Sequence, residues 1–586
     1  IPGAPFCRGT GSRRSRPMTR RRHGRSKIAT SCGRRSGGWG LRDISEGSAP
    51  LTRAPEPDPM RDFHRPGRSA VFAENGVCAT SHPLASATAI DVLKRGGNAA
   101  DAAVAAAVLL GFCEPQMTGI GGDCFAMIKP AGSETPIGLN GSGRAPAGAS
   151  ADALRSEGLK AIPERSAHAV TVPGAVAAFE RLLADHGKLG LADALAPAIA
   201  YAEAGVPVAP RVAYDWASSV EKLQGDARAL FLTDGAAPKP GDLFRAPGQA
   251  EVLRRIARQG AKAFYEGEVA QDMVESLRAL GGVHTLEDFA AVKPDYVDPV
   301  SGPYRDVEVL ELPPNGQGAT ALLLMRLLEA FEIARLDPFG PMRAHLEAEA
   351  TKLAYDARNR FLADPDAMRF GLEPMLDAAK IEGLTRLIDP QRALPDVRKA
   401  TGAVHKDTVY IAVVDRDRMA VSLIYSIFHD FGSGLASKKF GINFHNRGAA
   451  FSLEDGHPNM LAPGKRPLHT IIPAMLRRGG RVEAPFGVMG GQYQATGHAR
   501  LVSNIVDFGM DPQAAIDAPR CFVEDGALML ERGYEEAAIR GLEAKGHAVR
   551  RRDAPLGGAQ MIRIHHDRGV LEGASDPRKD GAAVGY

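Results

Sequence analysis

The chain has 586 residues, which is long enough for two ordinary domains or for one large domain built from several layers. Its formal charge of +3 conceals an uneven distribution, because residues 1–59 hold 13 Lys and Arg against 4 Asp and Glu, and the rest of the chain holds 59 against 65. The body is therefore acidic, with a net charge of −6. An acidic body disfavours binding to nucleic acid, and we expect no such partner.

Residues 1–59 are rich in Arg, Gly, Ser and Pro and show no hydrophobic period of a helix or a strand, so they are predicted to be a disordered basic leader. One interpretation is a targeting arm. However, the run Arg20–Arg22 is not followed by the apolar stretch of about 7–15 residues that a secretory signal needs. We favour an over-extended gene start, with the native protein beginning at Met60. No apolar run reaches the roughly 18 residues of a membrane span, and the expected location is cytoplasmic.

The chain has six cysteines, of which Cys7 and Cys32 lie in the leader. The other four show neither a CxxC pair nor the spacing of metal ligands, and they are Cys78, Cys113, Cys124 and Cys521. They are interpreted as buried or free thiols. Nothing in the sequence predicts a metal or an organic cofactor.

Two helices are predicted between Pro83 and Leu110. The first ends at Lys94-Arg95 before a Gly-Gly stop, and Asn98 caps an alanine-rich second helix that is apolar all round and so should be buried. A glycine loop at Met117–Asp123 then leads into an apolar strand at Cys124–Ile128. The loop lacks the spacing of a phosphate-binding motif, and nucleotide binding is not expected.

Residues near 150 to 390 alternate helical segments with short loops, and they are interpreted as scaffold. Helices are expected at Val176–His186 and Ala344–Phe361. The irregular turn Pro313–Gly318 precedes a third apolar helix at Ala319–Leu328.

A β-hairpin is predicted from Val409–Val414 and Met419–Ile427, which are rich in β-branched residues and are joined by a four-residue loop. Pairing Val414 with Met419 places Thr408 opposite Tyr425 and beside Ser426, with slippage of a residue or two allowed. Two hydroxyl groups thus meet at one end of the hairpin.

That position suits a threonine released as a new amino terminus, because its α-amino group can take the proton of its own hydroxyl near neutral pH. Ser426 would orient the Thr408 hydroxyl. Further along, the strand from Phe486 runs into Gly490-Gly491, which allows backbone N–H groups to approach a ligand as an oxyanion hole requires. An ordinary tight turn is the alternative interpretation of the glycine pair.

Several segments in order along Met60–Tyr586 resemble the gamma-glutamyltranspeptidase family. They are Ala79–Ala85, Gly96–Ala102, Gly119–Asp123, Asp407-Thr408, Lys465–Pro467, Gly490-Gly491 and Gly573–Arg578. The resemblance implies an αββα sandwich of the N-terminal nucleophile hydrolase type, made as a precursor. It also implies self-cleavage between Asp407 and Thr408 into a large subunit of residues 60–407 and a small catalytic subunit of residues 408–586.

By the same resemblance, Thr408 is the nucleophile, Ser426 is the hydroxyl residue beside it, and Gly490 and Gly491 form the oxyanion hole. The acyl group would pass through an ester on Thr408 and then to water or to an amine. The implied partners are a small amide substrate and the two subunits of one precursor, while any higher oligomer is left open.

The departures from the family pattern concern the substrate. Family members that act on glutathione bind the glutamyl amino group with Asn, Gln and Asp, where this chain has Phe428, Arg447 and Ala450. They bind its carboxylate with an Arg and two serines, where this chain has Ser142, His469 and Thr470. Arg144 is a candidate substitute for that Arg.

An arginine at position 447 favours an acyl part that carries a carboxylate and no amine, because guanidinium binds carboxylate and repels ammonium. A surface ion pair is the alternative interpretation of Arg447. His429 and His469 are interpreted as residues for shape or hydrogen bonding rather than as proton carriers.

The segments Ser422–Gly434, Asn446–Gly448 and His457–Asn459 resemble the branch that includes oxamate amidohydrolase and some cephalosporin acylases. The preferred function is therefore an amidohydrolase or acyltransferase acting on an amide such as oxamate or a glutaryl amide. The first alternative is a glutathione hydrolase and γ-glutamyltransferase. The second, from another class, is a catalytically inactive protein that binds a small carboxylate.

Overall fold

The computed structural model describes residues 67–395 and 408–586, which belong to one compact unit, Pro57–Tyr586. Two antiparallel seven-stranded sheets form its centre. The first sheet, in spatial order, is β19 (Ala582–Gly585), β2 (Gly76–Thr80), β10 (Val409–Asp415), β11 (Ala420–Ser426), β3 (Asp123–Lys129), β4 (Ile137–Gly141) and β7 (Asp295–Val297). The second is β1 (Val71–Ala73), β18 (Val570–Ser575), β17 (Gly558–His565), β13 (Arg481–Met489), β12 (Ala474–Arg478), β9 (Val307–Glu311) and β8 (Val300–Tyr304).

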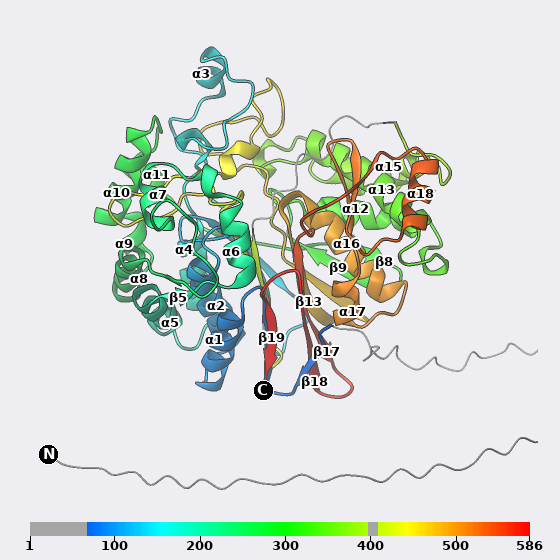
Figure 1. The fold of residues 1–586 in the computed structure, drawn as a ribbon, viewed down its shortest axis with the longest axis horizontal. Coiled ribbons are helices and arrows are strands. Elements are labelled where there is room, and N and C mark those ends of the chain that lie inside the picture. The colour runs from blue at the N-terminus through cyan, green and yellow to red at the C-terminus, as the bar shows by residue number, and fades with distance from the viewer. Residues whose placement is uncertain (1–66, 396–407) are drawn as a thin grey trace, which may run out of the picture. The chain divides into compact units, whose positions relative to one another are not determined.

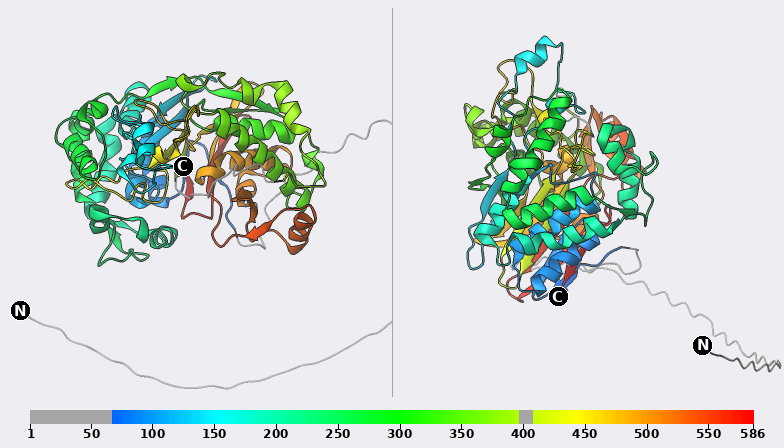
Figure 2. Two further views of the ribbon diagram at one scale, coloured as in Figure 1. Left: turned by 90° about the horizontal axis from the view of Figure 1, so that it is seen from above. Right: turned by 90° about the vertical axis from the view of Figure 1, so that its left-hand side faces the viewer.

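Helices cover the outer face of each sheet, as Figures 1 and 2 show. Those on the side of the first sheet are α1 (Pro83–Lys94), α2 (Ala99–Cys113), α4 (Ala175–His186), α5 (Leu191–Ala204), α6 (Pro210–Ala217), α7 (Gly225–Phe231), α8 (Pro247–Gln259), α9 (Lys262–Tyr265), α10 (Gly267–Ala279) and α11 (Leu286–Ala290). Those on the side of the second sheet are α12 (Gly318–Glu329), α13 (Pro341–Phe361), α14 (Glu373–Leu376), α15 (Ala378–Thr385), α16 (Gln494–Val506), α17 (Pro512–Asp517) and α18 (Glu536–Ala544). The result is the predicted αββα sandwich.

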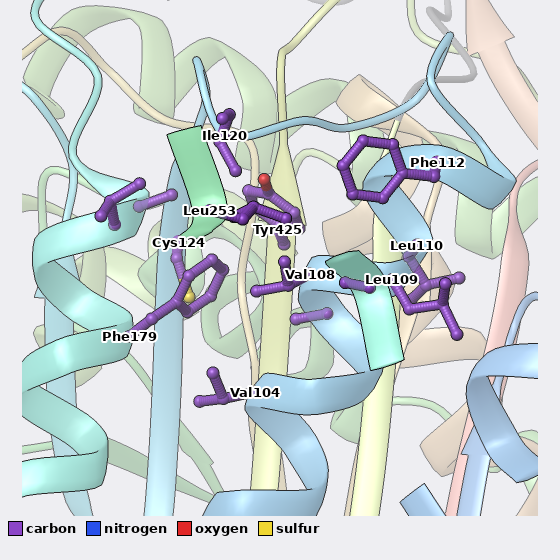
Figure 3. Packing of buried hydrophobic residues seen from close by; sticks show 14 of the residues in the cluster. Val104, Val108, Leu109, Leu110, Phe112, Ile120, Cys124, Phe179, Leu253 and Tyr425 are labelled. Atoms are coloured by element: carbon purple, nitrogen blue, oxygen red, sulfur yellow. The ribbon is translucent and has the colours of Figure 1, made fainter. Parts of the chain in front are cut away.

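Three apolar layers hold the sandwich together. Between the sheets, residues such as Phe125 and Tyr410 of the first sheet pack with Met475 and Ile562 of the second. The two outer layers lie between each sheet and its helices. In the layer on the first sheet, side chains of α2 pack around Tyr425 of β11, as Figure 3 shows.

The predicted helices are confirmed, with ends that differ by a few residues. Asn98 caps α2 through a capping box with Asp101, and every residue of α2 is buried. A helix this apolar must be covered on all sides, and α1, α4 and α5 pack against it. The helices expected in the scaffold correspond to α4, α12 and α13.

The hairpin of β10 and β11 is confirmed, but its predicted register is wrong by one residue. Val414 pairs with Ala420, and Val409 pairs with Tyr425. Residues 416–419 join the strands in place of the predicted 415–418, because the Asp415 carboxylate accepts the backbone N–H groups of Asp417 and Met419 and so keeps Asp415 in the ladder. Arg418, in this loop, has a positive φ of 60°.

Smaller elements lie outside the sandwich. They are α3 (Ala151–Ser156), the pair β5 (Val206–Pro207) and β6 (Leu243–Phe244), and the three-stranded sheet of β14 (Cys521–Glu524), β15 (Ala527–Leu530) and β16 (Val549–Arg551). Cys78, Cys113, Cys124 and Cys521 are buried free thiols, as predicted. Among the described helices, none combines the length and the apolar character that a bilayer crossing demands. The predicted leader 1–59 lies outside the described residues.

Candidate active site

Thr408 adjoins the start of β10 and is buried, with 1% of its surface exposed. Its Oγ1 donates a hydrogen bond of 3.2 Å to Oγ of Ser426, the last residue of β11. The corrected register explains this contact, because continuing the Val409–Tyr425 pairing by one step brings Thr408 opposite Ser426. The hairpin thus fixes the two hydroxyl groups that the sequence analysis paired. Asp407 lies outside the described residues.

The chain turns sharply after β11. Ser426 Oγ accepts the backbone N–H of Phe428 at 2.9 Å, and Phe428 has a φ of 77°, in the left-handed region that an aromatic residue rarely adopts. Such a conformation persists only where surrounding contacts impose it, and it is common at functional sites. The centroid of the Phe428 ring lies 3.9 Å from that of His429 and 4.0 Å from the Arg447 guanidinium.

Arg447 is completely buried. Its Nη1 donates to Thr470 Oγ1 at 3.0 Å, while Nε and Nη2 have no hydrogen-bond partner among the described residues. Burial lowers the pKa of the guanidinium to about 9, and the negative charge of Asp123 opposes part of that shift. The alternative interpretation of Arg447 as a surface ion pair is therefore wrong, because the side chain is inside the protein and its donors are not used up.

A buried carboxylate, Asp123, organises the neighbouring residues. Asp123 pairs with Ser426 in the register of β3 and β11, and its Oδ2 lies 3.0 Å from His469 Nε2 and 3.6 Å from His445 Nδ1. Its Oδ1 accepts the N–H groups of Gly143 and Gly174. Burial raises the pKa of Asp123, but the two histidines and Arg447 outweigh that effect and hold it well below its usual value.

The same cluster keeps His469 neutral. Burial and the positive charge of Arg447 lower the pKa of His469 to about 3, and His469 Nδ1 has no hydrogen-bond partner among the described residues. From the sequence, Asp123 is recognised only as part of a family motif, and His445 is not predicted. A signal was present, since His445 comes two residues before Arg447, but only the fold brings both next to Asp123.

The glycine pair follows directly on β13. Gly490 has a φ of 122° and Gly491 a φ of 54°, and a Cβ built on Gly490 would lie only 2.9 Å from Cα of Gly557. Glycine is therefore required here by conformation and by space. Gln317 Nε2 donates to the carbonyl oxygens of both Thr470 and Gly491, at 2.8 and 3.3 Å, and so links the glycine pair to the Arg447 side of the site.

The remaining predicted site residues are dispersed. His429 Nδ1 contacts Asn446 Nδ2 at 3.0 Å and the Glu164 carboxylate at 3.2 Å, and burial lowers its pKa. Arg144 is about half exposed, lies 3.6 Å from the Asp364 carboxylate, and lines a cavity of about 320 Å³. Ser142 lines the same cavity, and Ala450 ends the short turn that begins at Arg447. The guanidinium of Arg144 donates to the carbonyl oxygen of Gly464 at 3.0 Å and also lies 3.9 Å from the Asp295 carboxylate.

Known proteins share the sequence and the fold of this chain. Residues 85–586 match the gamma-glutamyltranspeptidase family. The chain is 36% identical to the glutathione hydrolase-like YwrD proenzyme of Bacillus subtilis, over 88% of this chain and 99% of that protein. It is 35% identical to the oxamate amidohydrolase proenzyme of Klebsiella pneumoniae, over 88% of this chain and 100% of that protein. The crystal structure of cephalosporin acylase from Bacillus halodurans superposes with a TM-score of 0.84 and 37% identity, over 90% of this chain and 99% of that one.

Proposed function

Because this chain belongs to the gamma-glutamyltranspeptidase family, we propose that it is an amidohydrolase whose nucleophile is Thr408, released as an amino terminus by cleavage of the Asp407–Thr408 bond. The observation that carries this proposal is the buried pair of hydroxyl groups at the end of the hairpin, Thr408 Oγ1 and Ser426 Oγ, 3.2 Å apart. After cleavage, the free α-amino group of Thr408 belongs to the same residue as the attacking hydroxyl and acts as the general base.

In the proposed reaction, the α-amino group takes the hydroxyl proton as Thr408 Oγ1 attacks the carbonyl carbon of the amide. The backbone N–H groups of Gly490 and Gly491 stabilise the negative charge that develops on the carbonyl oxygen. The tetrahedral intermediate collapses, the C–N bond breaks, and the amine leaves with the proton. Water then attacks the ester on Thr408 and releases the acid, or an amine accepts the acyl group.

The proposed subunits, 60–407 and 408–586, remain associated after cleavage. In the first sheet, β10 of the small subunit pairs with β2 of the large subunit, and β11 pairs with β3. Separating the subunits would break both ladders and expose the apolar layers on each side. A tight heterodimer is therefore the proposed active form.

We propose further that the acyl part of the substrate carries a carboxylate and no amine. The support comes from Arg447, which is buried beside the Ser426–Phe428 turn with two hydrogen-bond donors unused by the described residues. A buried cation with free donors favours an anion and disfavours an ammonium group. Oxamate and glutaryl amides have this chemistry, and the name of the Klebsiella relative, an oxamate amidohydrolase, is consistent with it.

Replacing Arg447 tests the substrate class. With a glutaryl anilide as substrate, Arg447→Gln should lower kcat/KM by about 10- to 100-fold, the equivalent of one hydrogen bond to a charged group. With an uncharged acyl anilide of the same length, the variant should lose little, because no carboxylate is bound. Continuous release of the aniline provides the measurement for both substrates.

Arg144→Gln is the matched control, since Arg144 is the other arginine proposed for carboxylate binding but is half exposed and lies beside Asp364. It should leave the preference for the glutaryl compound unchanged. A wild-type enzyme that turns over a γ-glutamyl anilide strongly and the glutaryl compound weakly would support the glutathione hydrolase alternative, which the name of the Bacillus subtilis relative favours.

A further inference from the structure

A second group of chemically reactive side chains lies away from the active site. His345 and Glu349 stand one turn apart on α13, and His547 follows α18. All three are buried, and their potential ligand atoms lie within 4.8 Å of one another. We propose that these residues bind a zinc-like divalent cation that joins the large and small subunits. The joining of subunits, though not the binding itself, rests on the proposed cleavage before Thr408.

The spacing of the three groups suits a tetrahedral ion. Ligands bound about 2.0–2.1 Å from a tetrahedral zinc stand about 3.3 Å apart. His345 Nδ1 lies 2.8 Å from His547 Nε2, and His547 Nε2 lies 3.8 Å from Glu349 Oε1. One separation is shorter and the other longer than the roughly 3.3 Å expected between tetrahedral ligands. Small side-chain movements would therefore give a site with three protein ligands and one open position.

Neighbouring backbone groups orient two of the ligands. His345 Nε2 lies 2.8 Å from the carbonyl oxygen of Asp389, which favours the tautomer with its lone pair on Nδ1, facing His547. Glu349 Oε2 accepts the backbone N–H of Leu394 at 2.6 Å, leaving Oε1 toward the cluster. Hydrogen bonds of this kind, from the outer atom of each ligand to the protein, are typical of metal sites.

The competing cation in this structure is Lys352, whose Nζ lies 2.7 Å from Glu349 Oε1. A divalent ion must displace this ammonium group from the carboxylate. Lys352 is therefore the residue that sets the affinity of the site.

A cavity of about 580 Å³ provides both a route and a place for the displaced lysine. Lys352 and His547 line it, together with Lys545, Arg392, Leu394 and Leu528. The ion and its water ligand can enter from this side, and the Lys352 side chain can rotate into the cavity. The positive charge of Lys352, Lys545 and Arg392 weakens the attraction for a cation, and we expect micromolar rather than nanomolar binding.

The site would connect three parts of the chain across the proposed cleavage. His345 and Glu349 belong to the large subunit. Their hydrogen-bond partners, Asp389 for His345 and Leu394 for Glu349, belong to it as well. His547 belongs to the small subunit. A bound ion would therefore add one more link between the subunits, and should raise the thermal stability of the processed enzyme.

The test is zinc binding to the purified, processed enzyme after treatment with a chelator. Equilibrium dialysis with elemental analysis should find one zinc per heterodimer. His547→Ala and Glu349→Gln should each weaken binding by at least about tenfold. Lys352→Met should strengthen binding, because it removes the competing ammonium group while leaving all three ligands in place. His566→Ala, which removes a histidine in the loop after β17, is the control and should bind like the wild type.

Thermal unfolding with and without zinc provides a second measurement. The ion should raise the melting temperature of the wild type and raise that of Lys352→Met further, without affecting His547→Ala. Retained amidase activity in each variant shows that it has folded. The proposal is overturned if neither the wild type nor Lys352→Met binds zinc stoichiometrically, or if His547→Ala and His566→Ala bind it equally well.

Discussion

Thr408→Ala is expected to abolish amide hydrolysis, with a fall in turnover of at least about 10³-fold, because it removes the proposed nucleophile. The same substitution should leave the chain uncut, since the hydroxyl that attacks substrate is also the group that attacks the Asp407–Thr408 bond. The loss should not reflect unfolding. The hydrogen bond from Thr408 Oγ1 to Ser426 is lost, and such a bond contributes about 1 kcal/mol.

Thr408→Ser is the matched control. It keeps the hydroxyl and the amine and deletes only a methyl group, so it should be cleaved and should retain measurable turnover. Release of the amine product, followed for equal amounts of folded protein, compares the three proteins. Equal activity in Thr408→Ala and the wild type would show that another residue is the nucleophile.

Gly490→Ala should lower kcat by about 10²- to 10³-fold with a smaller effect on KM, as expected for damage to an oxyanion hole. The added Cβ would lie 2.9 Å from Cα of Gly557, on a backbone whose φ of 122° disfavours any side chain. Both effects move the N–H groups of Gly490 and Gly491 relative to Thr408. Steady-state kinetics on the processed enzyme measures the change.

Gly569→Ala provides the control for backbone strain alone. Gly569 also has a positive φ, of 70°, but a Cβ at that position would meet nothing within 4 Å, and the residue lies in the loop between β17 and β18. Its substitution should cost about 1 kcal/mol of stability and leave kcat intact. A similar loss of kcat in both variants would contradict the assigned role of Gly490.

Local patterns in the sequence predicted the elements that carry the site. Asn98 and the Gly96-Gly97 pair marked the boundary of α1 and α2, and the β-branched runs marked β10 and β11. The register failed by one residue because hydrophobic alternation does not reveal that Asp415 bonds the amides of its own loop. That small error concealed the direct pairing of Thr408 with Ser426.

The charged cluster around Asp123 could not be predicted from the sequence. Asp123 begins β3, while His445 and Arg447 lie two residues apart in the segment between β11 and β12, and His469 lies further along that segment. No local spacing rule relates all four. Arg447 had two equal interpretations in the sequence, because composition cannot show whether a side chain is buried. The fold decides between them by enclosing Arg447 beside Phe428 and Thr470. The metal-ligating group escaped notice for the same reason, since His547 is far along the chain from His345 and Glu349.

Intact-mass spectrometry of the purified protein, wild type beside Thr408→Ala, shows whether Thr408 becomes an amino terminus and then acts as nucleophile. We expect two fragments in the wild type, the smaller one matching residues 408–586, and a single uncut chain in the variant. An uncut wild-type chain that nevertheless hydrolyses amides, or cleavage at the same bond in Thr408→Ala, would contradict this role of Thr408.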